Sequence, residues 1–251
     1  MTTKRSMRLR SAVDPLEKEN IAKRQKLEKT EYEKRPFITY KGKCMYYTTL
    51  VDCAIACDEL LQQANRSEEE FVVGFDLEWP FNFQTGPGKV AVIQISPTLD
   101  KCYILHVSEM KKLPKSLSEF LEHPKVIITG VNIKNDVRKL ARDFPGFNSD
   151  KMVENCFDSG VMAKNCFPTS GRYSLEKLVN RILKMKINKD KKVRMSKWHI
   201  IPLSEAQQKY AAIDAYASLL LYYKIKEAEE IKAIKDKEDD EKHPEVLKLL
   251  N

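Results

Sequence analysis

Apolar and polar residues alternate most clearly in residues 71–79, which read FVVGFDLEW. Because successive side chains of a strand point to opposite faces, the large apolar residues share one face: Phe71, Val73, Phe75, Leu77 and Trp79. The other face carries Val72, Gly74, Asp76 and Glu78. Asp76 and Glu78 would lie about 6.5–7 Å apart along the strand, close enough to share one divalent cation or to bracket two. The simpler interpretation is a strand end that reaches solvent.

Further apolar runs predict the elements around this strand. Residues 89–96 and 101–107 are rich in β-branched residues, and their short connections favour antiparallel neighbours. Residues 126–129, which read VIIT, form a wholly apolar run typical of a strand covered on both faces. Residues 51–65 and 116–121 are expected to be helical.

A short helix with a carboxylate on its apolar stripe is predicted after residue 132. Ile133, Val137 and Leu140 recur at helical spacing, and Asp136 lies among them. A carboxylate on a packed face is unfavourable unless it is paired or bound to a metal ion. The alternative is that Asp136 interacts favourably with the dipole of the first helical turn, which Asn132 would cap.

The long helix predicted from about Ser204 to Glu227 carries another acid on its apolar face. Ser204 and Gln207 have the spacing of a capping box, which fixes the start of the helix. The apolar stripe of the helix consists of Tyr210, Asp214, Ala217 and Leu221. Alanines beside Asp214 would allow close approach to a sheet. The alternative is a buried tyrosine whose hydroxyl is hydrogen-bonded to Asp214.

The four acids therefore fall on three separate elements, each time on a face that the periodicity marks as buried: Asp76, Glu78, Asp136 and Asp214. Neutralising them all requires positive charge, and the same stripes carry no Lys or Arg. Bound divalent cations are the simplest explanation. Carboxylate ligands favour magnesium or manganese over zinc.

Composition restricts the partners and the compartment. The 251 residues carry a formal net charge of +8 and the sequence pI is near 9.0, which permits a nucleic-acid or anionic-membrane partner without requiring one. No apolar run approaches the length of a membrane span, and the N-terminus lacks the apolar centre of a secretory signal. We therefore expect an intracellular protein without a membrane partner.

The chain divides into three segments by composition. Residues 1–36 mix Lys and Arg with Glu without a sustained period, which predicts a basic, solvated or disordered tail. Basic clusters in this tail are also candidates for a nuclear import signal or a phosphate contact. Residues 37–228 hold the predicted strands and helices and form the expected domain. Residues 229–251 mix charges around a short apolar patch, which predicts a charged helix that frays into a tail.

A basic run, KDKKVRMSK, precedes the last helix at residues 189–197. A protein that accepts any nucleotide sequence must hold backbone phosphates rather than base edges. We therefore expect Arg194 and Lys197 to hold a substrate strand, against the alternative of an ordinary solvated loop. Trp198 is a candidate for stacking on a base. A tryptophan after a polar loop also commonly fills the edge of a core.

Three motifs in this order resemble those of the DEDD superfamily of 3′-5′ exonucleases, in its tyrosine-bearing branch. They are FDLEW, the N-x-x-x-D of Asn132 to Asp136, and the Y-x-x-x-D of Tyr210 to Asp214. Within the superfamily the chain is most similar to Werner-type exonuclease domains, through GFDLEWP, GKVAVIQIS, SLEKLV and YAAIDAYA. Arg138 departs from the pattern, because an aromatic residue is common at its position.

The resemblance implies an α/β, ribonuclease H-like fold: a mixed five-stranded sheet with helices on both faces and the site at the end of the first strand. It also implies two Mg²⁺ or Mn²⁺ ions and removal of nucleoside monophosphates from a 3′ end. Asp76 would bridge the two ions, Glu78 and Asp214 would complete one, and Asp136 would act mainly through the water shell of the other. Tyr210 would orient or help to deprotonate the attacking water.

The expected substrate is DNA, either single-stranded or with a recessed 3′ end, in replication, repair or genome maintenance in the nucleus. The chain lacks a phosphate-loop motif, so we expect a separate helicase as its partner. One alternative is an RNA-trimming exonuclease similar to ribonuclease D, because the metal site is indifferent to the sugar. Another is a nucleic-acid-binding module that has lost catalysis.

Overall fold

Six strands form one mixed sheet in the order β1-β6-β5-β2-β7-β8. In the computed structural model, which describes residues 15–188 and 190–242, the strands in that order are β1 (Lys43–Tyr47), β6 (Lys101–His106), β5 (Val92–Thr98), β2 (Phe71–Glu78), β7 (Val126–Gly130) and β8 (Cys156–Asp158). Strand β5 runs antiparallel to β2 and β6, as predicted. The pairs β1–β6, β2–β7 and β7–β8 are parallel.

The sheet has one strand more than the five that we expected. The sequence located neither edge strand, β1 or β8, and β1 runs along β6 from the Lys43–Lys101 pair to the Tyr47–Leu105 pair. Its backbone hydrogen bonds satisfy groups of β6 that would otherwise lie at the edge of the sheet. The aromatic residues around Gly42 had no clear period in the sequence, so this pairing was not predicted.

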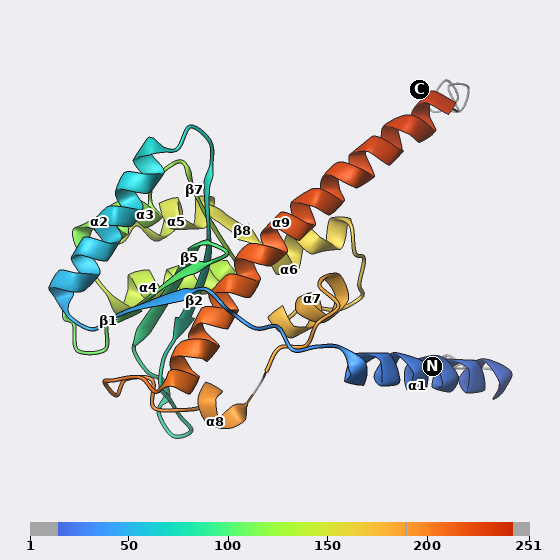
Figure 1. The fold of residues 1–251 in the computed structure, drawn as a ribbon, viewed down its shortest axis with the longest axis horizontal. Coiled ribbons are helices and arrows are strands. Elements are labelled where there is room, and N and C mark those ends of the chain that lie inside the picture. The colour runs from blue at the N-terminus through green and yellow to red at the C-terminus, as the bar shows by residue number, and fades with distance from the viewer. Residues whose placement is uncertain (1–14, 189, 243–251) are drawn as a thin grey trace, which may run out of the picture. The chain divides into compact units, whose positions relative to one another are not determined.

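Helices cover both faces of the sheet (Figure 1). The long helix α9 (Glu205–Lys242) crosses one face and contacts β2, β5 and β6. The other face packs against helices α2 (Leu50–Arg66), α3 (Lys115–Leu121), α4 (Ile133–Asp143) and α5 (Ser149–Glu154). Val73, Phe75 and Leu77 are buried in that second interface, which confirms the predicted apolar face of β2.

Strand β2 and helix α9 approach each other closely at Gly74. A Cβ atom at this position would collide with the carbonyl oxygen of Ala215 on α9. Ala211, Ala212 and Ala215 are fully buried in the same interface. Small residues on both elements therefore let the helix backbone lie against the strand, as the alanines of the sequence predicted.

The start of α9 is a capping box, as predicted. The backbone N–H of Ser204 donates to Oε1 of Gln207 at 2.9 Å, and the N–H of Gln207 donates to Oγ of Ser204 at 3.3 Å. The helix continues to Lys242, beyond the predicted end near Glu227. An ion pair one turn apart, between Lys226 and Glu229 at 3.6 Å, crosses the predicted end of the helix.

The shorter elements connect the sheet to the site. A hairpin of β3 (Phe81–Asn82) and β4 (Gly86–Pro87) follows β2. Between β8 and α9 lie α6 (Ser159–Met162), η1 (Ala163–Asn165), α7 (Leu175–Ile182) and α8 (Lys191–Arg194). Within the described residues, no helix is both long enough and apolar enough to cross a membrane.

The described residues before Phe37 form a unit of their own, and the second unit begins at Phe37. The first unit contains the helix α1 (Pro15–Lys34), where we expected a tail without regular structure. Glu19 and Lys23 form an ion pair at 2.7 Å along this helix. The basic cluster of residues 4–10 and the apolar patch near the C-terminus lie outside the described residues. The three segment boundaries remain predictions, and α9 runs without interruption through residue 229.

Candidate active site

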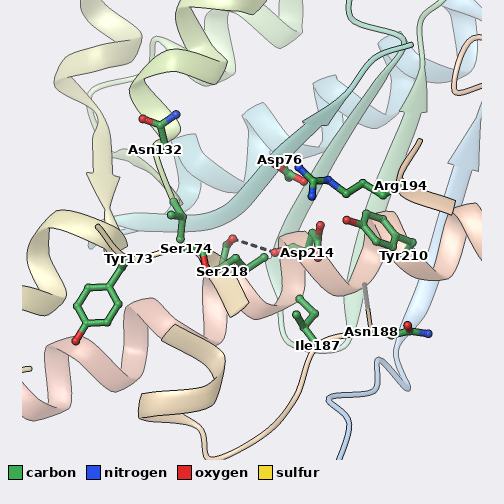
Figure 2. Close-up of a pocket in the computed structure, with 12 residues that line it drawn as sticks. Asp76, Asn132, Tyr173, Ser174, Ile187, Asn188, Arg194, Tyr210, Asp214 and Ser218 are labelled. Atoms are coloured by element: carbon green, nitrogen blue, oxygen red, sulfur yellow. Dashed lines mark hydrogen bonds between the residues drawn. The ribbon is translucent and has the colours of Figure 1, made fainter. Parts of the chain in front are cut away.

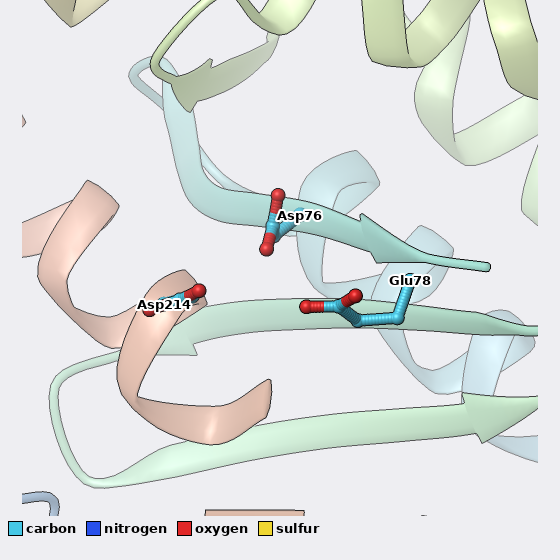
Figure 3. Close-up of side chains that lie close together, drawn as sticks. All are labelled: Asp76, Glu78 and Asp214. Atoms are coloured by element: carbon cyan, nitrogen blue, oxygen red, sulfur yellow. The ribbon is translucent and has the colours of Figure 1, made fainter. Parts of the chain in front are cut away.

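Three acids converge where β2 ends against α9 (Figure 3). Asp76, Glu78 and Asp214 each offer a carboxylate oxygen, and these oxygens lie within 4.8 Å of one another. Asp76 and Glu78 project from the same face of β2, as the strand period predicted, and Asp214 meets them from α9. Asp214 is 8% exposed. The close approach at Gly74 places Asp214 opposite the strand.

Asp136 approaches this group from a third element, the first turn of α4. It is not a member of the three-acid cluster within the described residues. Burial, followed by the charges of Asp76 and Asp158, raises the pKa of Asp136 to about 8, and Lys139 opposes the shift. The influence of Asp76 means that the two carboxylates lie within electrostatic reach of each other. Asp76, Glu78 and Asp214 therefore meet in one cluster and Asp136 lies outside it, and the site roles of the four acids stay predictions.

The predicted cap of α4 by the Asn132 side chain is wrong. Asn132 has φ 63°, in the left-handed region, and its side chain makes no capping hydrogen bond. Its Oδ1 instead accepts from Nδ2 of Asn135 at 2.9 Å. Asparagine is among the few residues that tolerate this conformation. The turn sends the chain from β7 directly into α4, and Asn132 lines the pocket beside the acids.

The acids sit in an environment that disfavours their charges. Burial of the Asp76 carboxyl group raises its pKa to about 7. Burial raises the pKa of Glu78 well above its usual range, and the charges of Asp76 and Asp214 add to this shift. Arg194 is the cation that acts against it. Such a cluster is stabilised by further positive charge.

A pocket of about 350 Å³ opens over the acids (Figure 2). Its lining includes Asp76, Asp214, Tyr210 and Arg194. Figure 2 shows the Arg194 side chain extending toward Asp76. Burial, with Asp214 as the next contribution, raises the pKa of Tyr210 above its ordinary value. The phenol is therefore protonated at neutral pH, which suits it to orient a water molecule rather than to deprotonate one.

The basic run before α9 separates into residues with different positions. Arg194 ends α8 and lines the pocket, whereas Lys197 is exposed and is not among the described residues that line it. Trp198 is fully buried, so it cannot stack on a base. Its Nε1–H donates to the carbonyl of Arg194 at 3.0 Å, and its ring centroid lies 6.0 Å from that of Tyr210. Trp198 thus supports two of the residues that line the pocket.

Several lining residues were not predicted: Val131, Tyr173, Ser174, Leu175, Ile187, Asn188 and Ser218. Ser218 had a signal, because it lies four residues after Asp214 on the same helical face, and its Oγ donates to the Asp214 carbonyl at 2.9 Å. Ser174 caps α7 by accepting from the N–H of Lys177 at 3.3 Å. Leu175 begins α7, and the remaining residues come from loops, where no period marks a face. Arg138 is exposed and lies outside the lining.

The chain resembles known proteins in sequence over most of its length. A family model described as 3′-5′ exonuclease matches residues 48–229. A 3′-5′ exonuclease of Drosophila erecta is 49% identical over 220 residues, which cover 87% of this chain and 62% of that protein. A 3′-5′ exonuclease of Drosophila melanogaster is 48% identical over 217 residues, which cover 86% of this chain and 62% of that protein. The chain thus spans about three fifths of the length of these curated relatives.

Solved structures share the fold at low sequence identity. The EXO domain of Aedes aegypti Nibbler has a TM-score of 0.61 and 20% identity, over 76% of this chain and 92% of that one. Escherichia coli RNase D has a TM-score of 0.59 and 16% identity, over 77% of this chain and 46% of that one. These structures share the fold of the chain, a mixed sheet with helices on both faces. The chain itself belongs to the 3′-5′ exonuclease family.

Exonucleases of the DEDD superfamily use divalent metal ions, and the residues of this site fit such ions. The donors are all carboxylate oxygens, which hard divalent cations prefer. Three of the oxygens already lie within 4.8 Å of one another. Burial raises the pKa of Asp76 and of Glu78, so further positive charge would stabilise their ionised forms beyond what Arg194 provides.

Proposed function

We propose that this protein is a two-metal 3′-5′ exonuclease that removes nucleoside monophosphates from DNA. The observation that carries the proposal is the meeting of Asp76, Glu78 and Asp214 within 4.8 Å, below a pocket that also presents Arg194 and Tyr210. Divalent ions held by these acids, together with the guanidinium of Arg194, would suit a phosphodiester, whose negative charge grows toward the transition state. The proposed ions are two Mg²⁺, with Mn²⁺ as a substitute.

Each acid has a distinct place in this proposal. Asp76, Glu78 and Asp214 would hold the ions directly. Asp136, outside that cluster on α4, would act through water bound to an ion. Divalent ions held there would supply charge that stabilises the attacking and the leaving oxygen of an in-line displacement. The protein thus supplies the geometry in which water attacks the terminal phosphodiester.

Tyr210 and Arg194 act on the water and on the substrate. The phenol of Tyr210 keeps its proton, so its oxygen or its O–H orients the attacking water beside Asp214. The guanidinium of Arg194 offers several donors to the scissile phosphate. We keep Lys197 as a contact for a phosphate farther along the strand, because it is exposed next to the pocket-lining α8.

The choice of DNA over RNA rests on sequence resemblance. The motifs are most similar to Werner-type exonuclease domains, and they continue through the segments between the acids. The alternative, an RNA-trimming enzyme, is favoured by the shared fold of E. coli RNase D, an exoribonuclease involved in structured RNA processing. That likeness is one of fold at 16% identity, so we give it less weight.

The proposal is tested with end-labelled single-stranded DNA, 3′-recessed DNA and matched RNA, in Mg²⁺, Mn²⁺ or EDTA. The native chain is compared with Asp76→Ala combined with Glu78→Ala. A control that removes two exposed acids at the other end of β2 is Glu68→Ala with Glu69→Ala. We expect the native chain to shorten the strands from the 3′ end in the presence of metal, and to do so faster on DNA than on RNA. This activity should be lost in Asp76→Ala with Glu78→Ala and kept in the control variant. Faster shortening of RNA would establish the RNA alternative, and binding without cleavage would establish the inactive module.

We further propose that the protein acts in the nucleus, in replication or repair, beside a separate helicase. The support is the basic composition of residues 1–36 and the resemblance to Werner-type domains. Microscopy of the tagged full-length protein tests the compartment. Retention in the cytoplasm would contradict the nuclear assignment, and failure to co-purify any helicase from nuclear extract would contradict the partner.

A further inference from the structure

Gln94 is a polar residue that the proposed mechanism does not use, and it lies in the core beside the acids. Its side chain is fully buried between the sheet and α9. Neither its Oε1 nor its Nε2 has a hydrogen-bond partner among the described residues. An unpaired buried carboxamide is unfavourable, because it has lost its hydrogen bonds to water without replacing them. Such a group is a candidate for a role that the protein atoms alone do not reveal.

The sheet register places Gln94 next to Asp76. Strands β5 and β2 are antiparallel, and Gln94 is the direct partner of Asp76 in their ladder. Side chains of directly opposed residues share a face, and their Cβ atoms lie about 4.5–5.5 Å apart. On the far side of Gln94 the partner is Ile104 of β6, which offers no polar group. The carboxylate of Asp76 is therefore the polar group nearest to Gln94 along its row of the sheet.

Alanines of α9 cover this part of the sheet together with Trp198: Ala211, Ala212 and Ala215. The polar residues on the same side of α9, Tyr210 and Asp214, lie at the site that contains Asp76. The direct ladder partner of Gln94 is Asp76, which acts only as an acceptor once it is ionised. An ionised Asp76 would accept a hydrogen bond from Nε2 of Gln94 with the carboxylate oxygen that does not face the ion.

We propose that Gln94 is a positioning residue for the metal site: its amide donates to Asp76 and fixes the orientation of that carboxylate when a divalent ion is bound. Partners of this kind orient metal ligands and strengthen binding, and their loss weakens metal affinity by about 10–100-fold. The inference rests on the metal site of the proposed function. It adds a residue that touches neither the ion nor the nucleic acid.

The test compares Gln94→Leu with the native chain. The matched control is Ser96→Ala, a buried polar residue two positions along the same strand and face, whose partner across the ladder is Gly74. Binding of Mn²⁺ is measured by electron paramagnetic resonance without nucleic acid, and thermal unfolding is measured in EDTA. We expect Mn²⁺ affinity to fall about 10-fold or more in Gln94→Leu and to stay within twofold of native in Ser96→Ala.

Stability separates positioning from simple packing. In EDTA we expect Gln94→Leu to unfold at the native temperature or above it, because an unpaired amide has been removed. Native Mn²⁺ affinity in this variant would overturn the inference, and so would a loss of affinity that accompanies a comparable loss of stability in EDTA. If Gln94→Leu does not fold, Gln94→Met takes its place, because a flexible thioether adapts to irregular space.

The proposed function and this inference fail in different experiments. If metal-loaded native protein releases no nucleotides from DNA, the proposed function is wrong, although Gln94 can still orient a metal ligand. If the native protein shortens DNA and Gln94→Leu binds Mn²⁺ with native affinity, only the role of Gln94 is wrong.

Discussion

The carbonyl oxygen of Ala215 on α9 occupies the space that a Cβ atom of residue 74 on β2 would need. A glycine at this position therefore sets how closely the helix that carries Asp214 lies against the strand that carries Asp76 and Glu78. The three carboxylates converge because two backbones can come into contact. The catalytic geometry thus depends on a residue that has no side chain.

Replacing Gly74 with alanine tests this dependence. We expect the added methyl group to push α9 outward, lowering the free energy of unfolding by about 1–3 kcal/mol. A shift of the acids by about 1 Å would reduce nuclease activity by about 10²-fold. The matched control is Gly171→Ala, where a Cβ atom meets nothing within 4 Å. Equal activity in the two variants, measured under saturating Mg²⁺, would disprove this role of Gly74.

Tyr210→Phe removes the phenolic oxygen and leaves the packing of the ring against Trp198. We expect the single-turnover rate to fall by about 10²-fold, because the attacking water loses a group that orients it. Metal affinity should change little, since the acids remain. Tyr216→Phe is the control on the same helix, where the ring centroid lies 5.4 Å from that of Tyr40. A Tyr210→Phe enzyme with native rate would remove the phenol from the mechanism.

Trp198→Ala should act on stability first. The indole is fully buried and its Nε1–H holds the Arg194 carbonyl at 3.0 Å, so the substitution leaves a cavity and an unpaired carbonyl. We expect the free energy of unfolding to fall by about 3–5 kcal/mol in urea titrations. His199→Ala, at the exposed neighbouring position, is the control and should cost far less. Native stability with weakened DNA binding would restore the stacking interpretation.

His106 predicts a specific loss of stability in acid. The Tyr46 hydroxyl accepts from the Leu203 N–H at 2.9 Å and lies 2.7 Å from Nδ1 of His106, so its proton is directed at an unprotonated nitrogen. Burial lowers the pKa of His106 from 6.5 to about 4, with His199 adding to the shift and the Trp198 backbone opposing it. The unfolded chain therefore binds a proton between pH 6.5 and 4 that the folded protein does not.

The contribution of His106 is complete above pH 6.5 and is lost as the pH falls toward 4, by about 3 kcal/mol in total. Urea unfolding at pH 4 to 7 gives the free energy of unfolding of the native chain and of His106→Gln. Carboxylates titrate equally in both proteins, so the difference between the two free energies reports on His106. This difference should narrow as the pH falls. A difference that is constant with pH would show that His106 titrates normally, and His199→Gln serves as the exposed control.

The sequence was most informative where a period and an unexpected residue coincided. Acids on apolar stripes identified Asp76, Glu78, Asp136 and Asp214, because a carboxylate in a packed face needs a specific partner. The alanines around Asp214 predicted the close contact of helix and strand. For the acids and for the alanines, the residues that the local pattern marks as buried are the ones that pack in the tertiary structure.

The sequence was less informative where position depends on long-range pairing. Strand β1 became visible only through its ladder with β6, which starts 58 residues later at Lys101. The pocket wall contributed by Tyr173 and Ile187 comes from loops without a period. Lys197 and Arg194 have the same charge and lie in one basic run, yet of the two only Arg194 lines the pocket, and the run has no period that would distinguish them.

Removal of nucleotides from a 3′ end is tested by following the first turnover on single-stranded DNA labelled at its 3′-terminal nucleotide, with Mg²⁺ present. We expect the label to appear as a nucleoside monophosphate before any internal label is released. We also expect release to stop in EDTA and in Asp214→Asn. Release of label in EDTA, or as longer fragments, would contradict a metal-dependent exonuclease built on Asp76, Glu78 and Asp214.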